Sequence, residues 1–296
     1  MTDLQECEFN ILKAVLNICE KYNIRYYLVC GSALGAVKYK GFIPWDDDID
    51  AAMPRPDYEL FLSKAQNELP DYYRVSNYRT DPYLPLTGSK IKDVRTTFIE
   101  PFHADRDIIH SVFIDVFPLD GYPSKKFGQF IFNARRRALE NKRDCCVNYE
   151  RNLKWGIRYF GRATIYLLHK AFGAYNYSQK TTAKLDKLFS SNPVDENDIW
   201  CNFSNSLSKV EYASRFQYGE GTVAEFEGLS VVVPENYDDY LTQKYGDWHA
   251  ELPKEQQAGH HHYIILDLDN PYTRYVKKSG KGKIKISESL QKEQEN

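Results

Sequence analysis

The chain has 296 residues and a mass of 34.6 kDa, which is enough for one large domain or two smaller ones. Hydrophobic residues make up 42% of the sequence and aromatic residues 15%, so a disordered chain is excluded. The formal net charge is −2, and no apolar run reaches the roughly 18 residues that a membrane-spanning helix needs. We therefore expect a protein without a membrane span and without a nucleic-acid partner.

Two further features predict a cytoplasmic protein. The six cysteines (7, 19, 30, 145, 146 and 201) form no CxxC pair and have no regular spacing, which indicates reduced thiols. The first ten residues, MTDLQECEFN, lack a basic segment followed by an apolar run, so no secretory signal is predicted.

The first third of the chain alternates between helical and strand patterns. Apolar residues between positions 4 and 22 recur at steps of three and four, which predicts an amphipathic helix with a start signal at Asp3 and Glu6. Residues 25–30 read as a strand that ends in a Gly31-Ser32 turn. Further expected elements are a strand at 49–53, a helix at 57–69, and strands at 73–78, 89–94, 96–100 and 111–121.

The residue pattern changes between positions 124 and 190, where long helical patterns contain much of the basic charge of the chain. The segment 125–187 contains 15 Lys and Arg residues against 4 Asp and Glu residues. Within it, Lys154, Arg158, Arg162 and His169 share one face of a predicted helix. This surface is either an ordinary solvated face or a binding face for phosphates, lipid headgroups or an anionic glycan.

Strand patterns return at residues 198–203, 222–228 and 229–234, and a helical pattern follows at 235–248. The end of the chain is polar. We therefore divide the sequence into a core at 1–123, a basic helical insertion at 124–190, a return to the core at 191–277 and a polar tail at 278–296.

A dense acidic cluster stands out at Asp46, Asp47, Asp48 and Asp50. In a strand, Asp48 and Asp50 lie on one face and Ile49 on the other, in the core. Adjacent carboxylates on a rigid strand are costly unless a cation neutralises them, and oxygen ligands suit Mg²⁺ or Mn²⁺. The turn before them lets Gly31 and Ser32 approach a phosphate closely. We predict a metal site at Asp48 and Asp50.

The string GSALGAVKYKGFIPWDDDID at 31–50 resembles the LicD family of phosphocholine transferases, to which the fukutin-related ribitol-phosphate transferases are akin. Segments 91–100, 113–121 and 231–248 also match this family, whereas the basic helical region does not. The resemblance implies an α+β fold of the nucleotidyltransferase type, with a mixed, twisted sheet and packed helices. The sixteen-residue gap between Ser32 and Asp48 is longer than in the wider nucleotidyltransferase superfamily but normal for this branch.

By the same resemblance, a third metal-binding carboxylate lies on a later strand. Asp115, in VFIDVFP, is flanked by apolar strand residues on both sides and takes that role here, with Asp120 as the weaker candidate. Together, Asp48, Asp50 and Asp115 are the predicted catalytic and metal-binding residues.

Other residues near these motifs are less sharply defined by the sequence. Lys90, Lys92 and Arg95 alternate toward the site and either neutralise a diphosphate or protect an edge strand, and we assign Lys92 and Arg95 to substrate binding. Asp46 and Asp47 either orient the metal ligands or cap the strand. The histidines at 260–262 are too close in sequence to converge on one zinc ion, although one of them could touch a phosphate.

The family resemblance implies Mg²⁺-dependent transfer of phosphocholine, or of a related polyol phosphate, from CDP-choline or another CDP-linked donor. The acceptor would be a hydroxyl group of a lipid-linked glycan precursor, such as a teichoic acid repeat or a lipopolysaccharide. Peripheral contact with the inner membrane face through residues 125–187 would fit such an acceptor. Two alternatives remain: a nucleotidyltransferase that modifies a small molecule, and a non-catalytic protein that binds anionic glycans.

Overall fold

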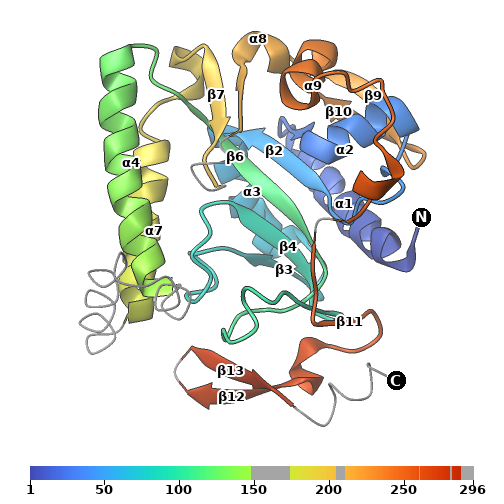
Figure 1. Cartoon of the computed structure of the whole chain (residues 1–296), viewed down its shortest axis with the longest axis vertical. Helices are drawn as coiled ribbons and strands as arrows, with labels where there is room; N and C mark the ends of the chain where they lie inside the picture. Colours follow the sequence, from blue (N-terminus) through green and yellow to red (C-terminus); the bar gives the residue numbers. More distant parts are fainter. Residues whose placement is uncertain (148–173, 205–210, 260, 281, 288–296) are drawn as a thin grey trace.

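The computed structural model describes residues 1–147, 174–204, 211–259, 261–280 and 282–287. It has the predicted α+β composition, with a curled, mixed sheet at its centre (Figure 1). The strand order is β1-β2-β6-β4-β3, and β7 and β8 extend the sheet from the end of β6. Only the β2–β6 pair of this sheet is parallel among the described strands.

The sheet is built from β1 (Tyr27–Leu28), β2 (Asp50–Pro54), β3 (Tyr73–Ser76), β4 (Ser89–Asp93), β6 (Phe113–Gly121), β7 (Ile199–Asn202) and β8 (Glu211–Ser214). The helices are α1 (Asp3–Tyr22), α2 (Cys30–Leu34), α3 (Arg55–Glu68), α4 (Lys126–Val147), α7 (Ala174–Phe189), α8 (Arg215–Tyr218) and α9 (Tyr237–Tyr245). Smaller strands are β5 (Thr97–Ile99), β9 (Thr222–Phe226), β10 (Leu229–Val233), β11 (Ile265–Asp267), β12 (Val276–Gly280) and β13 (Lys283–Ile286). Short helical turns are formed by Gly35–Tyr39 (π-helical), Val194–Glu196, Lys254–Gln256 and Tyr272–Arg274.

The first helix confirms the amphipathic pattern but starts differently from the prediction. The cap is Thr2, whose hydroxyl accepts a hydrogen bond from the Gln5 backbone N–H, while the Gln5 side chain accepts one from the Thr2 N–H. This reciprocal pair is a capping box. Asp3 and Glu6 lie within the first turn, where their charge favours the helix dipole without capping it.

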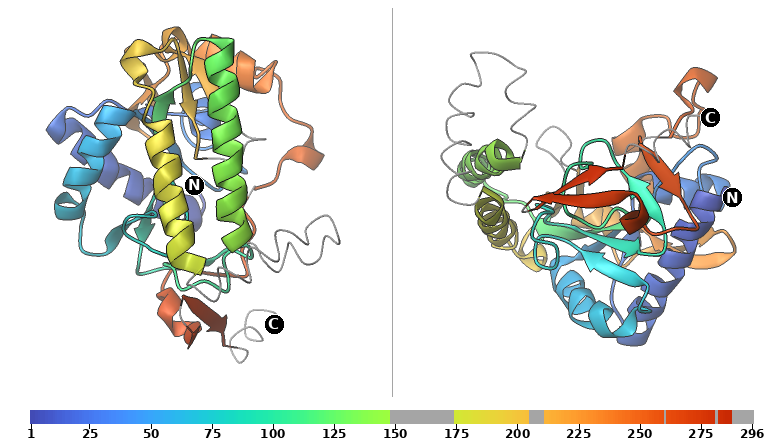
Figure 2. Two further views of the ribbon diagram at one scale, coloured as in Figure 1. Left: turned by 90° about the vertical axis from the view of Figure 1, so that its left-hand side faces the viewer. Right: turned by 90° about the horizontal axis from the view of Figure 1, so that it is seen from below.

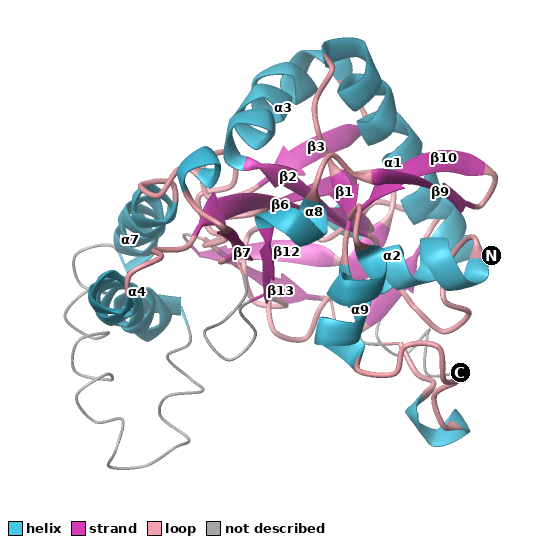
Figure 3. Ribbon diagram, turned by 90° about the horizontal axis from the view of Figure 1, so that it is seen from above, coloured by secondary structure: helices cyan, strands magenta, loops and turns pink. Residues whose placement is uncertain are grey.

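Helices α1 and α3 lie together on one face of the sheet (Figure 3). Alternate residues of β6 face them: Ile114 and Val116 are fully buried, and Asp120 bonds with Arg55 at the start of α3. The opposite face of β6 carries Asp115. One face of the sheet therefore forms the hydrophobic core, and the opposite face carries the polar side chain of Asp115.

The predicted helical insertion appears as two neighbouring helices, α4 and α7, that run along one side of the molecule (Figure 2). They pack through their own small core, which is made of Phe132, Leu185, Leu188, Phe189, Cys201 and Phe203. The predicted basic face of Lys154, Arg158, Arg162 and His169 lies outside the described residues. No helix within the described ranges is both long and apolar enough to cross a membrane.

The last described residues include the first part of the predicted polar tail at 278–296. Strands β12 and β13 form a hairpin there, and Ile284 is buried beside a cluster that contains Ile99, Ile265 and Tyr275. The alternation of lysine and isoleucine in KIKI at 283–286 is a strand pattern, and it is easily overlooked in such a polar segment.

Candidate active site

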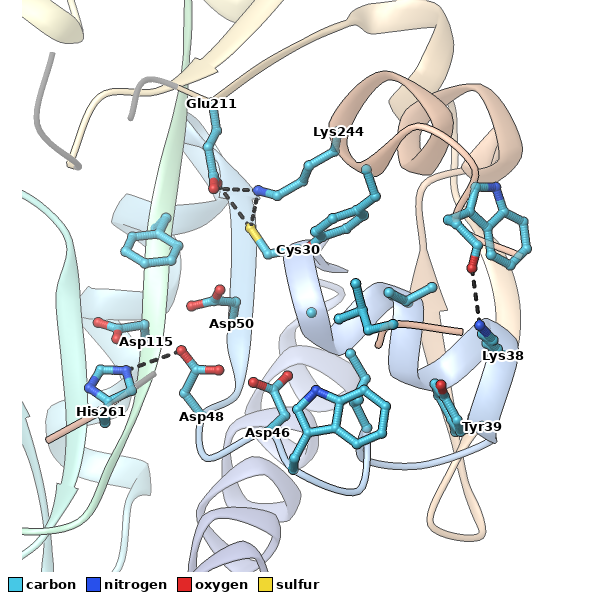
Figure 4. A pocket seen from close by; sticks show the side chains of 18 of the residues that line it. Cys30, Lys38, Tyr39, Asp46, Asp48, Asp50, Asp115, Glu211, Lys244 and His261 are labelled. Carbon is cyan, nitrogen blue, oxygen red and sulfur yellow. Dashed lines mark hydrogen bonds and ion pairs between the residues drawn. The ribbon is translucent and has the colours of Figure 1, made fainter. Parts of the chain in front are cut away.

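The parallel pairing of β2 with β6 brings the predicted carboxylates together. Asp50 and Asp115 are direct register partners on the two strands. Asp48 lies just before β2, but the pairing already begins there, because the Asp115 N–H donates to the Ile49 carbonyl at 2.9 Å. Ile49 is fully buried, as the alternation predicts. All three carboxyl groups therefore line one pocket (Figure 4).

This pocket is a cavity of about 560 Å³, a size typical of small-molecule sites. Its walls come from parts of the chain that are far apart in sequence: the segment from Cys30 to Asp50, strands β4 and β6, the start of β8, and the end of α9 with the segment that follows it. Besides the three predicted carboxylates, the charged lining residues are Lys38, Asp46, Lys90, Glu211, Lys244, Asp247 and His261.

Burial and mutual repulsion make negative charge costly at the centre of the pocket. The pKa of Asp50 is raised well above its usual value by burial and then by the charges of Asp48 and Asp115. Burial also raises the pKa of Asp115, although Lys90 opposes this with an ion pair at 3.2 Å. Nearby positive charge would lower both pKa values. The pocket is therefore suited to a ligand or ion that carries positive charge.

Asp48 is the exception, because it already has a cationic partner. Burial alone would raise its pKa, but the hydrogen bond with His261 and the attraction of Lys90 outweigh burial and lower the pKa. His261 Nε2 lies 3.2 Å from Asp48 Oδ2, and its Nδ1 lies 3.7 Å from Glu100 Oε1. Burial opposes protonation of this histidine, yet the hydrogen bonds to the two carboxylates raise its pKa to about 10. The imidazole is therefore a cation that holds Asp48 in place.

The oxygen donors of the pocket suit a hard divalent cation by their chemistry. Within the described ranges, however, no group of three or more His, Cys, Asp or Glu side chains is already gathered as a metal site. Asp48 is directed at His261 and Asp115 at Lys90. A cation at this place would compete with those two contacts. The oxygen donors therefore suit a divalent cation by their chemistry, but they are not already arranged around a single metal position.

Gly31 and Ser32 both lie beside the carboxylates, where they help to shape the site. The Ser32 hydroxyl accepts a hydrogen bond from the Asp50 backbone N–H at 2.8 Å, which ties the turn to β2. A Cβ atom at Gly31 would lie 2.5 Å from Asp46 Oδ2. Glycine is thus required here because the Asp46 carboxyl group approaches the backbone closely.

The two predicted substrate-binding cations do not lie in the pocket. Lys92 is buried and donates to the Ile109 carbonyl, and burial lowers its pKa to about 8. Arg95 follows β4, binds Asp93 through two nitrogens and stacks on Tyr72 at 3.7 Å. The alternation along β4 is correct, but the carboxylates lie at the other end of the strand. Lys90 is the residue of this segment that reaches them.

Asp120, the weaker candidate for the third carboxylate, has a structural partner instead. It lies on the opposite face of β6 from Asp115, is 1% exposed, and accepts hydrogen bonds from Arg55 at 2.8 and 2.5 Å. It is absent from the pocket lining.

The structure also places the acidic and histidine residues whose roles the sequence left open. Asp46 lines the pocket, and its pKa is raised to about 8 by burial and by the neighbouring Asp48 and Asp47. Asp47 accepts hydrogen bonds from the His261 backbone N–H and so anchors the histidine segment. Of the described histidines in that segment, His261 enters the pocket and His262 is exposed.

Sequence reasoning missed Glu211 and Lys244, which come from β8 and α9. Lys244 lies within LTQKYGDW, a segment that was used only for its family resemblance. Lys244 lies beside Cys30, which is more than 200 residues earlier in the chain, and no local sequence pattern predicts this contact.

The fold and the pocket define an α+β protein whose mixed sheet presents three carboxylates, flanked by lysines, to a small-molecule cavity. Residues 23–150 match the family described as LicD/FKTN/FKRP, nucleotidyltransferase domain. This range contains Asp48, Asp50, Asp115 and Lys90.

One curated relative covers nearly the whole chain. The lipopolysaccharide cholinephosphotransferase LicD of Haemophilus influenzae is 28% identical over 262 residues, which is 85% of this chain and 92% of the relative. An uncharacterized protein of Rickettsia typhi is 30% identical over 129 residues, which is 40% of this chain and 38% of that protein. Residues 23–150 thus carry the match to the LicD/FKTN/FKRP family, and the similarity to LicD of Haemophilus influenzae extends over most of the chain.

Proposed function

We propose that this chain is a phosphotransferase that moves phosphocholine, or a related polyol phosphate, from a CDP-linked donor to a hydroxyl group of a lipid-linked glycan precursor. The proposal is supported chiefly by one observation: Asp48, Asp50 and Asp115 lie together in one cavity, within the part of the chain that matches the LicD family. The Haemophilus influenzae relative is named as a transferase of this kind that acts on lipopolysaccharide.

In this proposal, Asp48 and Asp50 would hold Mg²⁺ or Mn²⁺, with Asp115 completing a second position or accepting a proton. When bound, such a cation neutralises charge on the diphosphate oxygens. The acceptor oxygen forms a bond to the phosphorus that bears choline, and the bond from that phosphorus to the oxygen of CMP breaks. The hydroxyl proton passes to a carboxylate, for which Asp115 is placed.

Lys90 and His261 have a supporting part in the proposed reaction. Lys90 Nζ lies 3.2 Å from Asp115 Oδ2 and 3.2 Å from the centre of the Phe113 ring, so it is held firmly beside the phosphate position. His261 fixes Asp48 through the contact at 3.2 Å. His261 and Lys90 thereby favour the charged forms of Asp48 and Asp115.

The proposed function is tested by measuring nucleotide release. The protein is incubated with Mg²⁺, a glycan acceptor, and CDP-choline, CDP-ethanolamine or CDP-glycerol in separate reactions. We expect CMP to appear with at least one donor, and only when the acceptor is present. Consumption of CTP or ATP with release of pyrophosphate would favour the nucleotidyltransferase alternative.

A lipid-linked acceptor requires contact with a membrane surface, and α4 offers a candidate for it. In this proposal, the core at 1–123 and 191–277 has the nucleotidyltransferase-type fold, and the insertion at 124–190 faces the acceptor at the inner membrane face. Phe127 and Phe130 near the start of α4 are 74% and 70% exposed, and Ile131 is also exposed. Exposed cations border these side chains at Lys125, Lys126, Arg135 and Arg137. Exposed aromatic residues bordered by cations are typical of helices that lie in a membrane interface.

We predict that replacing Phe127 and Phe130 together by serine weakens binding to vesicles containing anionic lipid by about tenfold or more, since each buried phenylalanine contributes about 2 kcal/mol. Binding of the unchanged protein should fall as salt rises, because exposed charges are screened over about 10 Å at 0.1 M. Vesicle co-sedimentation measures both effects. Phe216→Ser is the matched control, since Phe216 is 69% exposed on α8. If Phe216→Ser weakens vesicle binding as much as the double replacement does, α4 is not the membrane-binding helix.

A further inference from the structure

A second polar cluster lies in the pocket beside Asp50, and the reaction outlined above does not use it. It joins Cys30 at the start of α2, Glu211 at the start of β8 and Lys244 in α9 (Figure 4). Lys244 Nζ donates to Glu211 Oε1 and to Cys30 Sγ, the latter at 2.9 Å. Cys30 Sγ in turn donates to Glu211 Oε2 at 3.0 Å. The three side chains thus form a closed ring of contacts.

Lys244 keeps the ability to bind a further group. An ammonium group has three N–H donors, and the contacts described here engage two of them. The side chain is 22% exposed and lines the cavity. Burial would lower its pKa, but Cys30 and Glu211 outweigh burial and hold the pKa above its usual value. The pocket therefore contains a fixed, charged ammonium group with a donor to spare.

The position of Lys244 complements that of Lys90. Lys90 pairs with Asp115 at 3.2 Å, whereas Lys244 contacts Cys30 and Glu211 on the side of Asp50 away from Asp115 (Figure 4). The two lysines therefore belong to different ends of the carboxylate row. A donor with two linked phosphates carries two negatively charged groups, and one lysine on each side of the carboxylates could bind one phosphate each.

The cluster is also built at a conformational cost. Cys30 has φ of +56°, a left-handed conformation that residues other than glycine adopt rarely. This conformation turns the chain from β1 into α2 and directs the thiol at Lys244 and Glu211. The Tyr240 hydroxyl accepts the Cys30 backbone N–H at 3.2 Å and supports the turn.

We infer that Lys244 is a second phosphate-binding residue of the donor site, and that Glu211 and Cys30 are positioning residues that hold its ammonium group. The inference rests on the proposed function only for the identity of the ligand, a nucleoside diphosphate ester. The competing explanation is a structural ion pair that joins β8 to α9.

Binding and turnover distinguish these explanations. The affinity for CDP and for inorganic pyrophosphate, each with Mg²⁺, is measured by calorimetry on the full chain. We expect Lys244→Met to weaken both ligands by about tenfold or more and Lys244→Arg to restore most of the loss, because charged hydrogen bonds to phosphate are strong. Glu211→Gln should change CDP affinity by less than about threefold while lowering kcat, since it keeps the ammonium group but loosens its position.

Lys278→Met is the matched control, because Lys278 also pairs with a carboxylate, Asp107, but lies outside the pocket. Thermal unfolding is followed for every variant. If Lys244→Met melts early but binds CDP and pyrophosphate like the unchanged protein, the residue is structural and the inference is wrong. Where the methionine variant does not fold, Lys244→Gln, which can still bond both partners, gives the same two outcomes.

Failure of the proposed function would look different. In that case the unchanged protein would bind pyrophosphate, Lys244→Met would lose that binding, and no CDP-linked donor would release CMP. The phosphate site would then stand without the proposed reaction.

Discussion

Replacing Asp50 by asparagine is expected to reduce acceptor-dependent CMP release by about a thousandfold or more, because Asp50 binds the metal in the proposed function and the loss of a metal ligand costs several kcal/mol of transition-state stabilisation. Asparagine keeps the size of the side chain, so the register of β2 with β6 should survive. The raised pKa of Asp50 means that its charge destabilises the folded protein near neutral pH. We therefore expect the variant to melt at the same temperature as the unchanged protein, or at a higher one.

The control for this experiment is Asp71→Asn, which makes the same chemical change at an exposed position outside the pocket. Initial rates with saturating Mg²⁺ and with EDTA measure activity, and differential scanning calorimetry measures the melting temperature. Activity within tenfold of the unchanged protein would show that Asp50 is not a metal ligand.

The largest effect on stability is expected from Arg55→Met. The Arg55 guanidinium bonds Asp120 at 2.5 and 2.8 Å and Asp186 of α7 at 2.9 Å, and all three side chains are buried. Removing the cation deprives the buried Asp120 of its ion-pair partner and leaves Asp186 with Arg79 and Tyr78 alone, and breaking a buried ion pair typically costs about 3–5 kcal/mol. Since Asp186 belongs to α7, the loss should also weaken the attachment of that helix to the core.

Chemical denaturation measures the free energy of unfolding. Arg79→Met is the matched control, because Arg79 also binds Asp186 and Glu59 but is 35% exposed, so we expect a loss of about 1 kcal/mol. Adding Asp120→Asn to Arg55→Met should recover part of the stability, because it removes one unpaired charge. A loss in Arg55→Met no larger than that in Arg79→Met would contradict this account.

Local patterns predicted the elements well where they are long and strongly periodic. The steps of three and four between positions 4 and 22 correspond to α1, and the alternation around Ile49 corresponds to its burial. The prediction is poorer where tertiary contacts determine the bounds of an element. The strand expected at 25–30 is only Tyr27–Leu28, because helix α2 already begins at Cys30.

The arrangement of the site depends on contacts between distant segments, which periodicity does not encode. The meeting of Asp115 with Asp50 follows from a parallel pairing across more than 60 residues, and it was expected only from the family resemblance. Charge and alternation assigned Lys92 to substrate binding, whereas in the structure Lys92 is buried and donates to the Ile109 backbone carbonyl. The sequence does not distinguish Lys244 from the other lysines, because its contact with Cys30 depends on the packing of α9.

The mass of the modified acceptor identifies the group that the protein transfers. After incubation with CDP-choline and Mg²⁺, a purified glycan acceptor is analysed by mass spectrometry, and the nucleotide product is identified in the same reaction. We expect an acceptor that has gained one phosphocholine group and an equal amount of free CMP. An acceptor that has gained a nucleoside monophosphate, or one left unmodified by every CDP-linked donor, would contradict the proposed function.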